Sequence, residues 1–184
     1  RDFTGVVPIR VVVTPDAAAP TRYDAEIDMG TGNPATVSVN VVIPAGGSLT
    51  WRTRGQGVSG ENGWALVTCE QKISGFAVFR QTKVGEAAQE VAVPMNSGWQ
   101  QRFLLPFDNL GNVTSVALSN VSGTEAASIS ATFRDENGVV LAGGYSRVLP
   151  ARGHIAFALP VENRRGTAEF VASGGRLSAV GLRF

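Results

Sequence analysis

The chain has 184 residues, of which 43% are hydrophobic and 17% are charged, with 22 glycines and 9 prolines, a composition typical of a folded, turn-rich β protein rather than a disordered one. Its formal net charge of +1 comes from scattered basic and acidic residues, which argues against nucleic acid or an anionic membrane surface as a partner. Its one cysteine, Cys69, excludes an internal disulfide framework and a multi-thiolate metal site, and no run of about 20 apolar residues is present to span a bilayer.

The first predicted element is a strongly β-forming segment near the N-terminus. Four aliphatic residues alternate along it, Val7, Ile9, Val11 and Val13. Such alternation predicts a half-buried strand, and the stretch 16–20 that follows is typical of a linker. The strand could pair with its own unit, which we favour, or complete a neighbour's sheet and build a filament by head-to-tail strand addition. The four residues are therefore candidate interface residues.

Three carboxylates alternate along the next predicted strand, Asp24, Glu26 and Asp28. Hard cations such as calcium favour oxygen ligands of this kind. Calcium ligands usually converge from loops, however, whereas alternate strand residues stand roughly 6.5 to 7 Å apart. We therefore interpret these residues as one exposed strand face and expect no metal site.

An internal repeat is the most informative feature of the sequence, because it sets the architecture. A turn-and-strand block recurs in two copies, and so does a block of two strands further along: 44–51 matches 150–157, and 63–78 matches 166–182. Upstream of these, 33–39 matches 125–131 more loosely. The order and rough spacing of the blocks are preserved. The repeat predicts an all-β protein with two related antiparallel Ig-like β-sandwich units in tandem.

The domain boundaries follow from the positions of the repeated blocks. We expect an N-terminal strand and linker over residues 1–22, a first unit over 23–95 and a second unit over 96–184. The alternative is one intertwined sandwich with internal pseudo-symmetry. The stretch 84–93 is the only one that resembles a helix, but it is short and lacks an apolar stripe, so we expect a loop or hairpin there.

The repeat lets aromatic positions be compared between the two copies. Trp64 of the first copy aligns with Thr167 of the second. Leu66 likewise aligns with Glu169, so a face that is polar in the second copy is apolar in the first. An apolar substitution on an outward face often marks a contact surface. Trp64 and Leu66 are therefore candidate interface residues, toward the other unit, which we favour, or toward a neighbouring subunit or a ligand.

Trp99 lies between the two predicted units, among the amide side chains of Asn96, Gln100 and Gln101. A tryptophan beside polar groups is a common platform for stacking on sugar rings. It is therefore the candidate ligand-stacking residue, although it could instead fill the junction between the units.

Two residues with reactive side chains align with less reactive residues in the other copy of the repeat. His154 is the only histidine, so any acid–base relay would need it, yet it aligns with Ser48 at an outward strand position. Cys69 aligns with Ala172, which predicts a small buried residue rather than a nucleophile, since no basic partner is evident. We therefore assign no catalytic residue and expect no cofactor.

Two further patterns concern turns and surface loops. The segment 135–138 carries Asn-Gly between two alternating stretches, which predicts a tight hairpin. Asn112 and Asn120 each begin an N-glycosylation sequon, but a three-residue pattern is weak.

Three runs of sequence resemble a known module: GWALVTCEQKISGFAVFRQ, RFLLPFDNLGNVTSVALSN and RRGTAEFVASGGRLSAVGLRF. They look like a β-sandwich module that occurs, often in tandem, in large secreted proteins of Acidobacteria and related environmental bacteria. The resemblance covers most of the chain from about Tyr23. It implies an extracellular, non-catalytic accessory role, and it carries no catalytic residues onto this sequence.

The sequence leaves two classes of function open. The favoured hypothesis is a secreted or cell-surface structural protein, in which the units act as rigid spacers or assembly subunits that associate with themselves or with other surface proteins. The alternative is a module that binds carbohydrate or another surface ligand through exposed aromatic residues such as Trp99. An enzyme is disfavoured, because no arrangement of residues typical of an active site is present.

Overall fold

The computed structural model describes residues 9–15, 21–28, 35–52, 64–69, 73–81, 89–96, 98–141 and 144–183. Within these ranges every regular element is a β-strand, and every strand pairing is antiparallel. The expected all-β fold class is confirmed. The chain divides into two compact units, Arg1–Ser97 and Gly98–Phe184.

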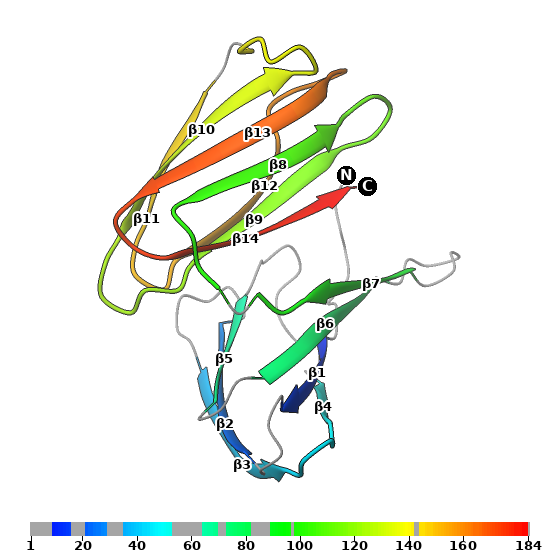
Figure 1. Cartoon of the computed structure of the whole chain (residues 1–184), viewed down its shortest axis with the longest axis vertical. Coiled ribbons are helices and arrows are strands. Elements are labelled where there is room, and N and C mark those ends of the chain that lie inside the picture. The colour runs from blue at the N-terminus through cyan, green and yellow to red at the C-terminus, as the bar shows by residue number, and fades with distance from the viewer. Residues whose placement is uncertain are drawn as a thin grey trace. The chain divides into compact units, whose positions relative to one another are not determined.

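The first unit contains two antiparallel sheets (Figure 1). Its strands are β1 (Ile9–Pro15), β2 (Thr21–Asp28), β3 (Ala35–Ile43), β4 (Leu49–Arg52), β5 (Trp64–Cys69), β6 (Ile73–Gln81) and β7 (Gln89–Pro94). One sheet has the order β4-β1-β6-β7 and the other has the order β3-β2-β5. The region that resembled a helix in sequence therefore contains strand β7.

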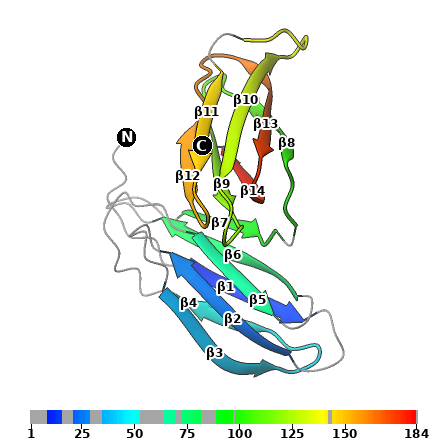
Figure 2. The ribbon, with the colours of Figure 1, turned by 90° about the vertical axis from the view of Figure 1, so that its left-hand side faces the viewer.

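The second unit also contains two antiparallel sheets, which lie as two layers in Figure 2. Its strands are β8 (Arg102–Asp108), β9 (Thr114–Asn120), β10 (Ala127–Asp135), β11 (Tyr145–Leu149), β12 (His154–Ala158), β13 (Arg165–Ser173) and β14 (Leu177–Arg183). The sheets have the orders β11-β10-β13-β8 and β12-β9-β14.

One hydrophobic core fills the second unit, and both of its sheets contribute to it. The largest fully buried apolar side chains are Phe133, Phe170, Leu118, Ile129, Leu177 and Val116. They alternate with exposed or half-buried residues, as in β10, where every second residue from Ala127 to Phe133 is buried. This period of two is the signature of strands with one face on a core. The unit is thus a β-sandwich.

The predicted internal repeat is present in the strand order of the structure. Strands β1 to β6 occupy the positions that β9 to β14 occupy in the second unit, because the orders β4-β1-β6 and β3-β2-β5 recur as β12-β9-β14 and β11-β10-β13. The registers also agree. Val11 lies opposite Trp51 and Ala77, and Val116 lies opposite Phe157 and Gly181.

The turn before β4 and the turn before β12 have the same geometry. Gly47 N donates to Pro44 O at 2.9 Å, and Gly153 N donates to Pro150 O at 2.9 Å. The residue before each glycine has a positive φ, 67° at Gly46 and 60° at Arg152. Glycine adopts this conformation without strain, whereas arginine does so at a cost of about 1–2 kcal/mol.

The looser upstream match in the sequence was wrong. Residues 33–39 fall largely in β3, whose counterpart is β11, whereas 125–131 fall largely in β10, whose counterpart is β2. Alternating apolar residues look alike in any half-buried strand, so the pattern alone could not choose between neighbouring strands. The Asn-Gly hairpin is confirmed, with Gly138 at φ 79° and the Asp135 N–H donating to Val139 O at 2.9 Å.

The N-terminal strand differs from the expected separate segment over residues 1–22. Strand β1 lies in the middle of a sheet and pairs with β4 on one side and β6 on the other. Its backbone edges are therefore occupied within the first unit, which agrees with the favoured alternative. The division between the units falls between Ser97 and Gly98.

Candidate functional site

The candidate interface residues of the N-terminal segment lie in β1 or outside the described residues. Val7 lies outside the described residues. Ile9, Val11 and Val13 are alternate residues of β1, and each has a partner in β6: Phe79, Ala77 and Gly75. A strand that is hydrogen-bonded on both edges has no free edge to offer to another chain.

Trp64 and Leu66 share one face of β5, and both are half-buried. Trp64 lies opposite Asp28, and Leu66 lies opposite Glu26. The carboxylate-bearing strand β2 lies between β3 and β5, so its backbone is paired on both sides. The side chains of Asp24, Glu26 and Asp28 are outside the described set, as is that of Cys69.

His154 is the first residue of β12 and lies opposite Ser119 of β9. Its side chain is half-buried. The next residues of the strand, Ile155 and Phe157, pack against the core, as their alternation in the sequence predicts. In the part of the chain that the structure describes, no group of three or more His, Cys, Asp or Glu residues is placed to hold a metal ion.

Trp99, the candidate stacking residue, is 49% exposed. The guanidinium of Arg176 lies over its ring, 5.2 Å from the ring centroid. The next residue is anchored, because Gln100 N donates to Leu177 O at 3.0 Å. The exposed indole is thus held beside the start of β14 by a cation–π contact, a geometry that sequence alone did not indicate.

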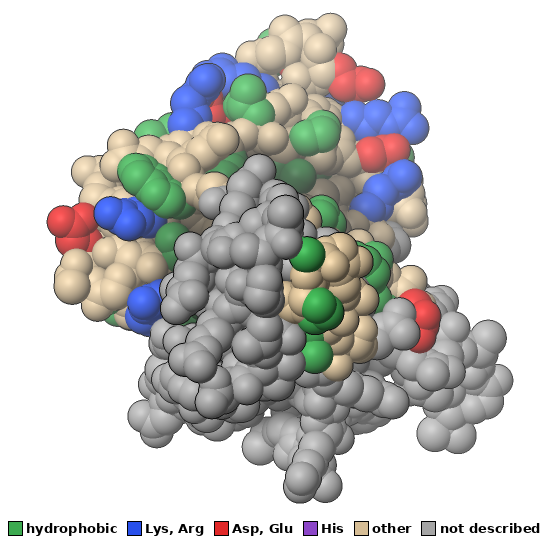
Figure 3. Space-filling view, turned by 60° about the horizontal axis from the view of Figure 1, so that its bottom comes forward, with side chains coloured by type: hydrophobic (Ala, Val, Ile, Leu, Met, Phe, Trp, Pro, Cys, Tyr) green, Lys and Arg blue, Asp and Glu red, His purple; other side chains and the backbone are tan. Residues whose placement is uncertain are grey.

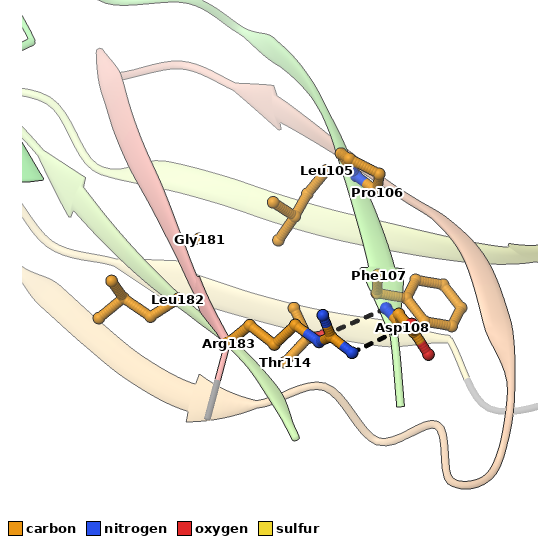
Figure 4. A pocket seen from close by; sticks show the side chains of 8 residues that line it. All are labelled: Leu105, Pro106, Phe107, Asp108, Thr114, Gly181, Leu182 and Arg183. Atoms are coloured by element: carbon orange, nitrogen blue, oxygen red, sulfur yellow. Dashed lines mark hydrogen bonds and ion pairs between the residues drawn. The ribbon is translucent and has the colours of Figure 1, made fainter. Parts of the chain in front are cut away.

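A shallow pocket of about 260 Å³ lies between strands β8 and β14. Its lining comes from Leu105, Pro106, Phe107 and Asp108 of β8, Thr114 of β9, and Gly181, Leu182 and Arg183 of β14. Figure 4 shows Leu105 directed from β8 toward β14 and Arg183 reaching across to Asp108. The floor is apolar, and one end carries charge.

Asp108 is the centre of the charge at that end of the pocket. It forms ion pairs with Arg165 Nε and Arg183 Nη2, each at 3.1 Å, and its Oδ1 accepts a hydrogen bond from the Leu110 N–H at 3.1 Å. The Leu110 N–H, followed by the guanidinium of Arg165, holds the pKa of Asp108 below its ordinary value of 3.8, although desolvation opposes the shift. Two arginines around one carboxylate leave a net positive charge there.

Gly181 of β14 lies against the side chain of Leu105 of β8. A Cβ at this position would collide with Leu105 Cδ1 and come within 3.4 Å of Leu105 Cγ. The absence of a side chain at Gly181 therefore lets Leu105 lie against the backbone of β14. Neither residue stands out in the sequence, because each lies in an ordinary strand pattern.

The outer face of the sheet β11-β10-β13-β8 carries exposed aliphatic side chains among short hydroxyl side chains. Leu104, Val148 and Val171 are 58%, 60% and 42% exposed. Their neighbours on this face are Ser128, Ser130, Thr132, Ser146, Thr167 and Ser173. The aliphatic residues are interrupted by one ion pair, Arg102–Glu169 at 2.7 Å.

On the face of the molecule that Figure 3 shows, the described residues carry both basic and acidic side chains. In the same part of the chain, no helix of the length and apolarity needed to cross a membrane occurs.

Asn120 joins three loops at one end of the second unit. Its side chain is 1% exposed, and Nδ2 donates to the carbonyl oxygens of Glu125 and Pro150 at 2.7 and 3.0 Å. Its Oδ1 accepts from the N–H groups of Ser122 and Arg176 at 3.2 and 3.0 Å. A fully hydrogen-bonded buried amide of this kind fixes the loops and leaves no free nitrogen for a glycan.

Asn109 plays a matching role at the start of the β8–β9 connection. It is 6% exposed, its Nδ2 donates to Val161 O, and its Oδ1 accepts from Thr114 N at 2.8 Å. Its backbone N–H also donates to Arg164 O at 2.9 Å. Both asparagines were missed as structural residues, because a sequence shows no difference between a buried and an exposed amide.

The comparisons with known proteins identify no family. No protein-family model matches the chain, and no curated protein is similar to it. A chain in the structure of the infectious bursal disease virus Gt strain aligns with a TM-score of 0.25 and 9% identity, over 97% of this chain and 57% of that chain. A likeness at this TM-score carries no argument about function.

Proposed function

We propose that this chain is a non-catalytic structural protein of the cell exterior, whose β-sandwich units serve as rigid subunits for assembly with copies of itself or other surface proteins. The observation that carries the proposal is the outer face of β11-β10-β13-β8. Exposed aliphatic side chains, among them Leu104 and Val148, lie there among serines and threonines. Such short side chains lose little conformational entropy on contact, so they add little cost where the exposed aliphatic side chains meet a partner surface.

The buried hydrogen bonds that hold the loops of the second unit support a role as a building block. Asn120 and Asn109 hold its loops through buried hydrogen bonds to several carbonyl and N–H groups. Loops that are fixed in this way resist local opening, which suits a spacer or subunit better than an enzyme with a moving lid. Because β1 is already paired on both edges, we do not expect it to act as a donor strand for another chain.

The test is the mass of the full chain by light scattering as its concentration rises, with negative-stain imaging of the same samples. We expect association that the double variant Leu104→Lys/Val148→Lys weakens. Val139→Lys is the matched control, because Val139 is 59% exposed but lies beyond β10 in the hairpin. A mass of one chain at every concentration, or equal weakening by the control, would overturn assembly through this face. Deletion of residues 1–15 is unsuitable, since it removes the central strand β1.

Trp99 favours a second candidate function, the binding of carbohydrate or another surface ligand. Its ring is 49% exposed and is oriented by Arg176. Aromatic rings held in this way stack on sugar faces, and an adjacent guanidinium donates hydrogen bonds to hydroxyl groups. Binding to a glycan array that Trp99→Ala abolishes and Val139→Ala preserves would support it. A folded chain that binds no glycan on a broad panel would exclude it.

A further inference from the structure

The two units differ in the strand that extends each repeated pair of sheets: β7 lies beside β6 in the first unit, and β8 lies beside β13 in the second. In the first unit, β7 pairs along β6 and completes the order β4-β1-β6-β7. In the second unit the counterpart of β6 is β14, which is the edge strand of β12-β9-β14 within the described residues. The second unit therefore presents the edge that β7 covers in the first.

The backbone of β14 shows which groups face this edge. Gln100 N donates to Leu177 O, so the carbonyl of Leu177 points away from β9. Because backbone groups alternate in direction along an antiparallel strand, those of Ala179, Gly181 and Arg183 point the same way.

The first unit shows how such groups are used. There the carbonyl of Gly75, the counterpart of Ala179, accepts from Met95 N at 2.9 Å, directly after β7. The edge of β14 beyond Leu177 thus carries the same backbone donors and acceptors as the edge of β6 that pairs with β7. Among the described residues, no strand pairs with this edge of β14.

The pocket between β8 and β14 lies beside this edge. In the first unit, Val93 of β7 lies opposite Ala77, the counterpart of Gly181. Residues directly opposite each other in an antiparallel pair share a face. A residue that an added strand places opposite Gly181 would therefore lie on the face of Gly181 that meets Leu105, where the pocket is.

The charge at the end of the pocket adds one requirement for an added strand. Arg165 and Arg183 share the single carboxylate of Asp108, which leaves positive charge at this end. In the first unit, Val91 of β7 lies opposite Phe79, the counterpart of Arg183, whereas Glu90 is one position further and points to the other face of the strand. An acidic residue at the position of Val91, opposite Arg183, would share the face of Gly181 and meet the unbalanced charge.

We propose that the open edge of β14 is an acceptor site for an extended strand of a different protein. The strand pairs antiparallel with β14, places a valine-sized side chain opposite Gly181, and carries an acidic residue opposite Arg183. Backbone hydrogen bonds supply the affinity, and the pocket beside Leu105 supplies the selectivity. This inference deepens the proposed assembly function and rests on it, because it names an edge and the kind of partner that the edge takes.

The experiment uses the full chain and a synthetic peptide with the sequence of residues 89–96, which copies β7. We expect saturable binding in a fluorescence titration, with slowed amide hydrogen exchange at Gly181 and Arg183. A peptide with Val93→Asp is expected to bind at least about tenfold more weakly, because its charge would enter the apolar pocket. The proposal would be overturned if neither peptide binds, or if both bind equally strongly. This test needs no variant of the protein.

A protein variant then tests the pocket itself. Leu105→Ala enlarges the pocket, so we expect it to favour a Val93→Leu peptide over the original peptide. Leu104→Ala is the matched control on the opposite face of β8, and we expect it to leave the preference unchanged. Equal peptide preference for all three proteins would overturn the assigned role of the pocket.

Two further outcomes separate this inference from the proposed function. Without peptide, amide exchange at Gly181 could slow as the concentration of the chain rises. That result would assign the edge to a second copy of this chain and overturn the proposal that a different protein occupies it. Peptide binding that persists in Leu104→Lys/Val148→Lys supports the acceptor edge even where association through the outer face fails.

Discussion

Leu105 of β8 packs against the backbone of β14 at Gly181, where a Cβ would collide with the Leu105 Cδ1 atom. The contact joins the edge strands of two different sheets of the second unit. We predict that Gly181→Ala lowers the unfolding free energy of this unit by about 1–3 kcal/mol, because Leu105 must leave its position. Amide exchange of β9, the central strand of its sheet, measures this free energy.

A double-mutant cycle shows whether Leu105 causes that loss. Leu105→Ala removes the side chain that the new methyl group would meet, so the double variant should lose less than the sum of the single changes, by about 0.5–3 kcal/mol. Additive losses would contradict the collision and place the cost of Gly181→Ala in β14 itself.

The buried amide of Asn120 gives the second prediction. Asn120→Ala removes its acceptor and donors, and it leaves the N–H groups of Ser122 and Arg176 and the Pro150 carbonyl without this partner. We expect a loss of about 3 kcal/mol, measured by urea unfolding. Asn112→Ala is the matched control, expected to cost under about 1 kcal/mol, since it makes one exposed hydrogen bond to Leu110 O. Equal losses would contradict the structural role of Asn120.

Asp108 gives a prediction about acid stability. Its pKa is held below 3.8 in the folded chain, first by the Leu110 N–H and then by Arg165. A depressed carboxyl pKa stabilises the fold above the unfolded value, and that contribution is lost as the pH falls from 3.8 through the folded-state pKa. Asp108→Asn should therefore flatten the decline of stability with acid in this window. An unchanged decline in thermal unfolding scans would show that other carboxyl groups cause it.

The buried hydroxyl of Tyr145 gives a prediction about a substitution that should not destabilise the fold. Its ring stacks on Phe157 with centroids 4.3 Å apart, but its buried hydroxyl has no hydrogen-bond partner among the described residues. Desolvation raises the pKa of this hydroxyl above 10.0. Tyr145→Phe keeps the ring contact and removes the unsatisfied group, so we expect stability to stay equal or to rise by about 1 kcal/mol at neutral pH. A loss of more than about 1 kcal/mol in urea unfolding would show that the hydroxyl has a partner.

The sequence predicted the fold class well because it follows from local chemistry. Alternating apolar residues define strands whatever the rest of the chain does, and Asn-Gly defines the turn at Gly138. The repeated Pro-x-x-Gly blocks likewise gave two turns with the same hydrogen bond, at Gly47 and at Gly153. Each of these features depends on a few adjacent residues, so it can be read without knowing which strands become neighbours.

The tertiary structure alone decided the pairing of strands and everything built on it. Alternation in 33–39 and 125–131 looks the same, yet these segments lie mostly in strands β3 and β10, which are not counterparts. The central place of β1, the burial of Asn120 and the contact of Leu105 with Gly181 likewise depend on residues far apart in the chain. Pairing is fixed by how all the faces are buried together, and a side chain's burial is set by neighbours that a local pattern does not name.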